Sequence, residues 1–200
     1  MRLVPHSAVV LTSTNAYDRI PRAMTVSSFT SLTLHPTPLV SFNIATPSRT
    51  LAAISESGRF NVHVLAADAS GAQVADWFSR GGVNADGRGA FEKLALAEGS
   101  GVDVVHFGRH GMAPLLEGQG VLYVLRCRVL ENGLLKNRRG LVRVRDHVVV
   151  FGEVAEIVEW RGAEGETEER FGLVYADRRY RQLGGCITPV EKKGGEVEEK

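Results

Sequence analysis

The stretch of residues 24–50 (MTVSSFTSLTLHPTPLVSFNIATPSRT) constrains the fold more than any other part of the chain. In residues 24–34, apolar side chains recur among threonines and serines, a pattern typical of a strand with one buried and one polar face. Pro36 and Pro38 interrupt this pattern, and residues 39–45 have the composition of a second strand. The stretch therefore predicts two neighbouring strands.

A helix is predicted directly after the second strand. Residues 46–50 (TPSRT) precede an apolar helical pattern that begins at Leu51, and either Ser48 or Thr46 would serve as the N-cap. The first turn of a helix presents unpaired N–H groups and the positive end of the helix dipole. With the Arg49 guanidinium and the hydroxyls beside it, this start predicts a pocket suited to a phosphate. A row of hydroxyls that leads to such a pocket suggests a ligand with a polar tail, such as a nucleotide or a flavin.

The rest of the chain contains many strand-like segments and only short helices. Helices are predicted from Ser48 to about Gly58, at residues 69–80 and at residues 91–96. Many strands with two or three short helices and no βαβ alternation predict a mainly β fold, an antiparallel barrel. The predicted strands are residues 7–14, 24–34, 39–45, 59–66, 102–107, 121–130, 141–145, 147–159 and 171–176.

Composition limits the classes of function. The chain of 200 residues fits one domain, and its net charge of +1 gives no reason to expect nucleic acid as a partner. Cys127 and Cys186 can build neither a disulfide scaffold nor a CxxC metal site, which favours a reducing compartment.

No apolar run approaches the roughly 20 residues that span a bilayer, and no signal peptide is recognised. We therefore predict one domain at residues 1–187, a charged, disordered tail at residues 188–200 and no membrane partner. The expected location is cytoplasmic, or the mitochondrial matrix if a targeting segment precedes this chain.

Histidines offer few alternatives for chemistry. His106 and His110 have a metal-ligand spacing only if they lie on a helix, and the glycines around them disfavour one, so no metal site is predicted. His147 follows Asp146 in a turn between two apolar strands, where the carboxylate could orient the imidazole; the alternative is an ordinary turn histidine. Gly-x-Ser-x-Gly, P-loop and Rossmann glycine motifs are missing, so serine hydrolase, NTPase and Rossmann dehydrogenase functions lack support.

Several motifs, taken together and in order, resemble the flavin reductase-like family, whose members bind FMN or FAD on a split β-barrel. The resemblance covers the chain from about Val4 to Leu183 and implies an antiparallel split β-barrel. Ala23 departs from the family, which more usually has glycine there; a positive φ at this position would cost alanine about 1 kcal/mol. The matching segments are residues 24–29, 38–43, 48–51, 58–65, 145–147, 152–154 and 173–175, together with Tyr180.

The resemblance also implies a flavin site. Residues 25–29 would line the isoalloxazine ring and the ribityl chain, residues 48–50 would take the phosphate, and Phe60 with Asn61 would complete the wall. The alternative is that the Ser/Thr row is simply the polar face of an amphipathic strand. The full set of cofactor-binding residues implied is Thr25, Val26, Ser27, Ser28, Phe29, Asn43, Thr46, Ser48, Arg49, Thr50, Phe60 and Asn61.

Three further residues are implied on the side of a nicotinamide substrate. The family has a histidine in this Asp-His turn beside the flavin, so we assign His147 a positioning role in catalysis. Tyr175 and Tyr180, in the segment YADRRYR, would lie on the NAD(P)H side; the alternative for them is a solvated strand with paired charges.

The function implied is an FMN-binding, NAD(P)H-dependent flavin reductase, with FAD as the other flavin considered. We expect a homodimer, and a separate monooxygenase component could use the reduced flavin. Three alternatives stay open: a flavin-binding electron carrier without reductase activity, a related split-barrel flavin oxidase, and a β-barrel that binds no flavin.

Overall fold

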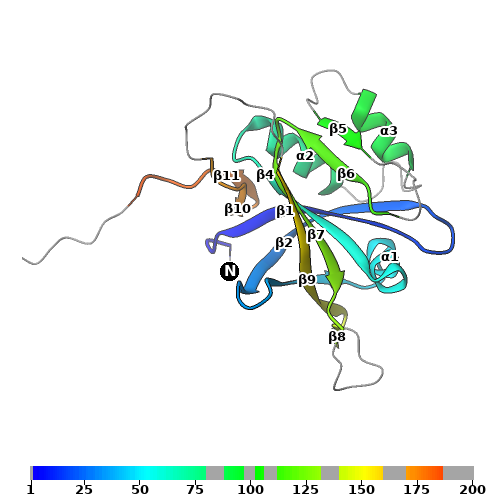
Figure 1. The fold of residues 1–200 in the computed structure, drawn as a ribbon. Helices are drawn as coiled ribbons and strands as arrows, with labels where there is room; N and C mark the ends of the chain where they lie inside the picture. Colours follow the sequence, from blue (N-terminus) through cyan, green and yellow to red (C-terminus); the bar gives the residue numbers. More distant parts are fainter. Residues whose placement is uncertain are drawn as a thin grey trace, which may run out of the picture.

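A computed structural model describes residues 2–79, 88–96, 102–105, 112–131, 140–159 and 170–186. Six strands form its centre: β1 (His6–Thr14), β2 (Pro21–Thr33), β3 (Leu39–Ala45), β4 (Arg59–Leu65), β7 (Val121–Val129) and β9 (His147–Glu159). They pair antiparallel in the order β1–β2–β3–β9–β7–β4, and β4 pairs back to β1, which closes a barrel (Figure 1). The predicted mainly β fold with an antiparallel barrel is confirmed. The predicted tail at residues 188–200 lies outside the described residues.

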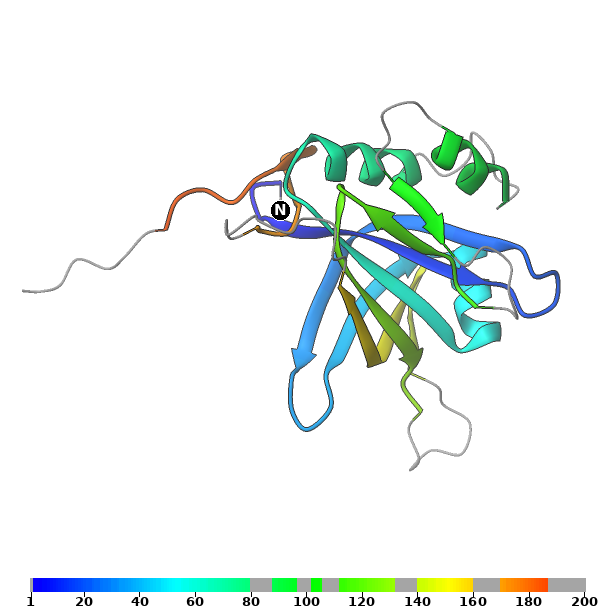
Figure 2. The ribbon, with the colours of Figure 1, turned by 45° about the horizontal axis from the view of Figure 1, so that its top comes forward.

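Smaller elements surround the barrel. The hairpin of β10 (Val174–Ala176) and β11 (Arg179–Arg181) lies beside the start of β1, and β8 (Leu141–Val144) pairs with the first residues of β9. The two-stranded sheet of β5 (Val102–Val105) and β6 (Leu115–Gly118) lies on the same side of the barrel as the helices α2 (Ala69–Ser79) and α3 (Arg88–Leu96) (Figure 2). The sequence did not predict β6 and β11, each too short to show an alternating pattern. The helices are α1 (Arg49–Ser57), α2 (Ala69–Ser79) and α3 (Arg88–Leu96).

The barrel interior is apolar and holds one cluster of buried side chains. The rings of Phe42 on β3 and Phe60 on β4 meet edge to face, with centroids 5.2 Å apart. Gly152 on β9 leaves room for this pair, since a Cβ there would overlap the Phe60 ring. Leu51 and Ile54 belong to the same cluster, so α1 covers one end of the barrel. Burying each such side chain stabilises the fold by about 1.5–3 kcal/mol.

A second apolar cluster lies outside the barrel wall. Side chains of α2, α3 and β6 pack there against β1, β4 and β7. Because β1 and β4 are covered on both faces, the polar face predicted for β4 is present but buried: Asn61 is 6% and His63 0% exposed.

Both ends of α1 lie where the sequence predicts them. Ser48, rather than Thr46, is the N-cap, and its Oγ accepts a hydrogen bond from the Leu51 N–H. Gly58 ends the helix in the left-handed conformation at φ 68°. Ala23 is a paired residue of β2 and has no positive φ, so alanine causes no strain there.

Candidate functional site

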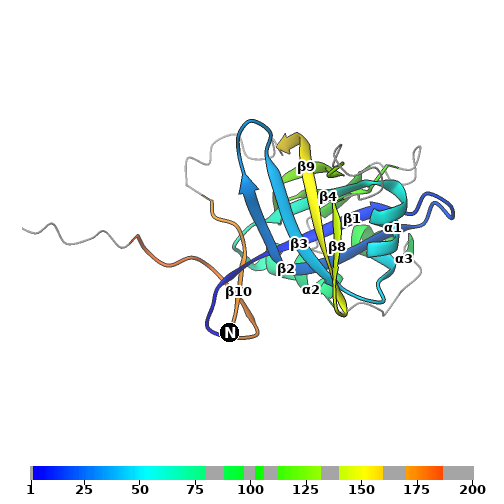
Figure 3. The same ribbon diagram turned by 90° about the horizontal axis from the view of Figure 1, so that it is seen from below.

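An opening between β2 and β3 is the main feature of the candidate site. β3 pairs with β9 along residues 39–45, but β2 and β3 pair only where residues 30–33 of β2 lie beside the start of β3. The two strands leave their common hairpin and run apart toward α1 (Figure 3). Among the described residues, β2 therefore has β1 on one side and no paired strand on the other over residues 21–29. We call this opening the wedge. Residues 23–28 of β2 lie on one side of it, and residues 43–45 of β3, with Thr46 directly after the strand, lie on the other.

Side-chain hydroxyls hold the two ends of the wedge. At the hairpin end, the Ser28 Oγ accepts the Asn43 N–H (3.0 Å) and donates to the Asn43 carbonyl (3.1 Å). At the helix end, the Thr50 Oγ1 donates to the Ala23 carbonyl of β2 (3.4 Å). These three bonds connect the separated elements without closing a strand ladder. Between them, the edge of β2 that faces β3 is paired with no strand of the described residues.

The N-terminus of α1 lies at the helix end of the wedge. Its N-cap Ser48 satisfies the Leu51 N–H, and the Ser48 carbonyl accepts the Ala52 N–H. The Thr50 N–H in the first turn has no carbonyl within the helix to bond, as at any helix start. Arg49 is exposed in the same turn. A helix dipole end, amide donors and a guanidinium together form an arrangement that binds anions.

The turn between β8 and β9 is fixed beside this helix start. Both the backbone N–H and the Oγ1 of Thr46 donate to the Asp146 carbonyl, at 2.7 and 3.0 Å. The next residue, His147, lies opposite Ala45 in the β3–β9 ladder. Its Nδ1 is 3.0 Å from the Asp146 Oδ1, and this bond lowers the pKa of the Asp146 carboxyl. With 45% of its side chain exposed, His147 is accessible at the rim of the wedge.

The five residues 25–29 differ in what they expose. The Thr25 hydroxyl donates to the Ala75 carbonyl of α2 (2.6 Å), and the Val26 side chain points into the barrel. Phe29 packs partly against the same interior cluster. Ser27 is exposed, whereas the half-buried Ser28 already bonds the Asn43 backbone, so Ser27 is the one of the five that offers a side-chain oxygen to a ligand. The backbone of the segment, more than its side chains, borders the wedge.

Phe60 and Asn61 do not lie at the wedge, and the expectation that they form a wall of it needs correction. Both belong to β4, which β1 separates from β2. Phe60 is 1% exposed inside the barrel, so it has no surface to offer a ligand. The Asn61 Nδ2 donates to the Ala113 and Pro114 carbonyls, at 3.2 and 3.0 Å. Phe60 is a core residue, and Asn61 fixes another part of the chain.

Asn61 is one member of a buried polar row that sequence reasoning missed as a unit. The row lies on β1 and β4, outside the barrel, and each member binds the backbone of residues 112–116. We call the row and this segment the polar clamp. Thr12 Oγ1 donates to the Pro114 carbonyl (2.6 Å) and Thr14 Oγ1 to the Met112 carbonyl (2.7 Å). The fourth member is His63.

His63 is the most deeply buried member of the clamp. Its Nε2 accepts the Leu116 N–H (3.0 Å), so the proton of the neutral ring is on Nδ1, which donates to the Val10 carbonyl (3.1 Å). Burial disfavours the charged ring and lowers the pKa of His63 to about 4. No sequence signal marks the clamp, because its partners are far apart in the chain.

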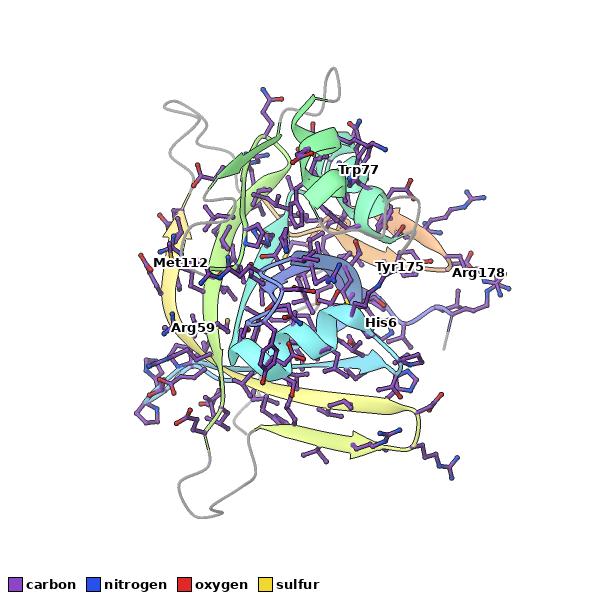
Figure 4. The ribbon with its side chains drawn as sticks, turned by 90° about the vertical axis from the view of Figure 1, so that its right-hand side faces the viewer. His6, Arg59, Trp77, Met112, Tyr175 and Arg178 are labelled. Carbon is purple, nitrogen blue, oxygen red and sulfur yellow. The ribbon has the colours of Figure 1, made fainter. Side chains whose placement is uncertain are left out.

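The two tyrosines predicted on the substrate side form a pair on the β10–β11 hairpin. Tyr175 and Tyr180 lie opposite each other with ring centroids 5.4 Å apart. Tyr175 is also the ladder partner of His6 on β1, and Figure 4 shows His6 and Arg178 near it. Because β1 lies between this hairpin and β2, the pair is on the far side of β1 from the wedge.

The described residues contain neither a cluster of potential metal ligands nor a helix that could span a membrane. No group of three or more potential metal-binding side chains occurs there, and His106 and His110 lie outside the described residues. None of the helices in that part of the chain is both long and apolar enough to cross a membrane.

Comparisons with known proteins concern the family and the fold of the chain. The model of the family described as flavin reductase like domain matches residues 1–184. The solved structure of the NADH:FAD oxidoreductase SgcE6 from Streptomyces globisporus C-1027 is 25% identical, with 92% of this chain and 89% of that chain covered and a TM-score of 0.64. A second structure of SgcE6, with NAD and FAD fragments, matches with a TM-score of 0.63 at 25% identity over 91% of this chain and 87% of that chain.

A more distant solved structure supports the fold alone. The styrene monooxygenase flavin reductase from Pseudomonas putida S12 is 20% identical over 93% of this chain and 96% of that chain, with a TM-score of 0.62.

Proposed function

The chain belongs to the flavin reductase-like family, and on that premise we propose that it is an NAD(P)H-dependent flavin reductase that binds FMN in the wedge. The observation that carries the proposal is that the open edge of β2 leads to the N-terminus of α1. Backbone amides and carbonyls of a free strand edge can bond the polar edge of a flavin ring, and a helix N-terminus suits its phosphate. The residues present therefore fit a flavin.

The phosphate end of the site consists of residues at the start of α1. The Thr50 N–H and the Arg49 guanidinium would bind phosphate oxygens, with the dipole of α1 favouring the negative charge. Ser48 contributes by capping the helix, and Thr46 by fixing the helix start to the β8–β9 turn. The exposed Ser27 and Asn43 would bond the ribityl hydroxyls, and the bond from the Asn43 N–H to the Ser28 Oγ supports this role by fixing the Asn43 backbone.

His147 defines the substrate side. A bound flavin supplies the acceptor for a hydride from the nicotinamide ring, a step that depends on stacking and orientation and requires no side chain to remove a proton from the substrate. The Asp146 carboxylate fixes the ring orientation of His147 at the rim of the wedge. We assign to this imidazole the placement of the nicotinamide, whereas Tyr175 and Tyr180, beyond β1 from the wedge, stay a prediction for the NAD(P)H side.

The proposal includes a homodimer. Val142 and Val144 are 49% and 52% exposed on β8, and Val144 is the ladder partner of His147. A second copy that covers these valines would also exclude water beside His147. A Val144→Asp variant should then elute as a monomer in size-exclusion chromatography with much reduced turnover, whereas a monomeric wild type would contradict this part of the proposal.

A separate oxygenase component is the proposed user of the reduced flavin. Support comes from two proteins of similar structure: the styrene monooxygenase flavin reductase, and the flavin reductase component of a bacterial two-component tryptophan halogenase.

Anaerobic absorption spectroscopy tests the proposed reaction. The protein is mixed with FMN, then with NADH or NADPH, and the flavin band is followed. Bleaching at a catalytic rate with one of the nicotinamides is expected. A bound flavin that neither nicotinamide bleaches would identify a carrier or an oxidase, and a protein without flavin binding would contradict the site itself.

The His147→Ala variant tests the substrate side. We expect turnover of NAD(P)H to fall by about 10-fold, with the Kd for FMN changed less than about 2-fold, because the imidazole positions the nicotinamide and not the flavin phosphate. Steady-state kinetics and a flavin titration check both numbers. Equal turnover of variant and wild type would make His147 an ordinary turn histidine.

A further inference from the structure

We propose that Thr46 is a positioning residue for the nicotinamide side of the site: its hydroxyl holds the β8–β9 turn, and through Asp146 it sets the place of His147. The inference rests on the proposed function and reassigns Thr46, which the family resemblance implies as a flavin-binding residue.

The first observation is where the hydroxyl proton of Thr46 goes. A threonine hydroxyl has one proton to donate. The Thr46 Oγ1 donates it to the Asp146 carbonyl (3.0 Å), whereas the Ser48 Oγ acts as an acceptor, for the Leu51 N–H. A phosphate near neutral pH offers mainly acceptor oxygens. While the bond to Asp146 stands, the Thr46 hydroxyl therefore has no proton to donate to a phosphate.

The second observation is that both donors of Thr46 bind the same carbonyl. The backbone N–H of Thr46 donates to the Asp146 oxygen at 2.7 Å, beside the hydroxyl at 3.0 Å. The β3–β9 ladder ends one residue earlier, at the pair of Ala45 and His147, so Thr46 extends the contact between these strands into the turn. The carbonyl belongs to the peptide group that joins Asp146 to His147, and two bonds to it limit the rotation of that group.

The third observation concerns what else holds His147. Its side chain is 45% exposed, so packing fixes the ring only in part. The ring Nδ1 lies 3.0 Å from the Asp146 Oδ1. The backbone and the ring of His147 therefore both depend on Asp146, and Thr46 is the residue that attaches Asp146 to the end of β3.

These contacts connect the two halves of the proposed reaction. Thr46 is two residues before the N-cap Ser48, so the segment that leads into the phosphate end also holds the turn with His147. Hydride transfer depends on how the nicotinamide is stacked and oriented, and a small displacement of a positioning group is enough to slow it. Loss of one of the two bonds to Asp146 should therefore reduce turnover without removing the flavin.

The test is the Thr46→Val variant, with Thr33→Val as the matched control. Valine has nearly the same shape as threonine, removes the hydroxyl and keeps the backbone N–H. Thr33 is likewise half-buried and its Oγ1 donates to a carbonyl, that of His35 (2.7 Å), but it is the last residue of β2, in the β2–β3 hairpin. Each variant should lower the Tm by about 2–4 °C, since each loses a side-chain hydrogen bond. Only Thr46→Val should lower kcat/KM for NADH or NADPH, by about 5-fold, with the Kd for FMN changed less than about 2-fold.

A double-mutant cycle with His147→Ala separates positioning from a general structural role. Because Thr46 acts through His147, Thr46→Val should cost less than about 1.5-fold in kcat/KM once the imidazole is gone. With His147 present, Thr46→Ser should recover the loss that Thr46→Val causes, because serine supplies the same donor to the Asp146 carbonyl.

Three results would overturn the inference. One is a Kd for FMN that Thr46→Val raises by about 10-fold with an unchanged KM for the nicotinamide, which would return Thr46 to the flavin phosphate. The second is an equal loss of kcat/KM with and without the His147 imidazole, and the third is a Thr46→Val variant that matches Thr33→Val. A wild-type protein that oxidises neither NADH nor NADPH in the presence of FMN would instead contradict the proposed function, so the two failures are distinguishable.

Discussion

The polar clamp and the wedge both lie along barrel strands with polar residues, yet another segment of the chain covers the clamp, whereas no strand of the described residues pairs with the edge of β2 at the wedge. In the clamp, four side chains bind the backbone of residues 112–116, and no buried side-chain polar atom of the described residues lacks a partner. In the wedge, Ser28 and Thr50 bind only at the two ends. The difference teaches that a polar row becomes a ligand site only where no other segment of the chain covers it.

The largest expected effect is on the clamp side of this comparison. His63→Ala should lower the free energy of unfolding by about 4 kcal/mol, because it leaves a cavity and two backbone groups without their bonds. Urea unfolding measures the change. The control Ser27→Ala, at an exposed position near the wedge, should change the same quantity by less than about 0.5 kcal/mol. Similar values for the two variants would remove the distinction between the regions.

Acid should weaken the clamp specifically through His63. The folded protein holds the pKa of His63 at about 4, below the ordinary value of 6.5 in the unfolded chain. Its contribution to stability is therefore complete above pH 6.5 and is lost as the pH falls toward 4, a loss of about 3 kcal/mol. A His63→Gln variant lacks this titration, so the difference in unfolding free energy between wild type and variant should shrink by that amount between pH 7 and pH 4. A constant difference would show that His63 does not titrate as a buried neutral ring.

Asn61→Ala tests whether this residue belongs to the clamp alone. We expect a loss of about 2 kcal/mol in the free energy of unfolding, since the Ala113 and Pro114 carbonyls lose a buried donor. Flavin affinity per folded molecule should stay within about 2-fold of the wild type. A loss of flavin affinity with unchanged stability would return Asn61 to the wedge.

Arg49→Ala is the smallest change and acts on the wedge. The Kd for FMN should rise about 10-fold, the lower end of the range for a charge-assisted hydrogen bond, because Arg49 is exposed. Stability should change by less than about 0.5 kcal/mol. Arg59→Ala, at an exposed position at the start of β4, is the control for charge and should leave the Kd unchanged.

Much of the fold could be predicted from local signals. The bounds of β3, α1 and β9 agree with the sequence within a residue or two, because each has a clear start or stop: proline before β3, Ser48 and Gly58 at the ends of α1, and the Asp146 turn before β9. The helix start as a place for an anion could also be predicted, since capping and the helix dipole are local properties. The elements that were missed, β6 and β11, are short and depend on their partners.

The residues of the site were harder to predict than its location. Thr25, Ser28 and Asn61 look alike as polar residues in alternating strands, but the hydroxyl of Thr25 binds α2, that of Ser28 binds Asn43, and Asn61 binds the clamp segment. These partners are up to 53 residues away in the chain. Periodicity indicates which face of a strand a residue occupies, but not what covers that face.

The sequence by itself determined the antiparallel β architecture, the helix start at Ser48 and the turn at Asp146, because strand alternation, capping and turn chemistry act over a few residues. Only the tertiary structure decided that β2 and β3 separate, that the turn at Asp146 lies beside that helix start, and that Phe60 and Asn61 face away from it. Barrel closure decides these three arrangements. The pairing of β4 with β1 determines which polar rows on the strands are covered by other segments of the chain and which are not.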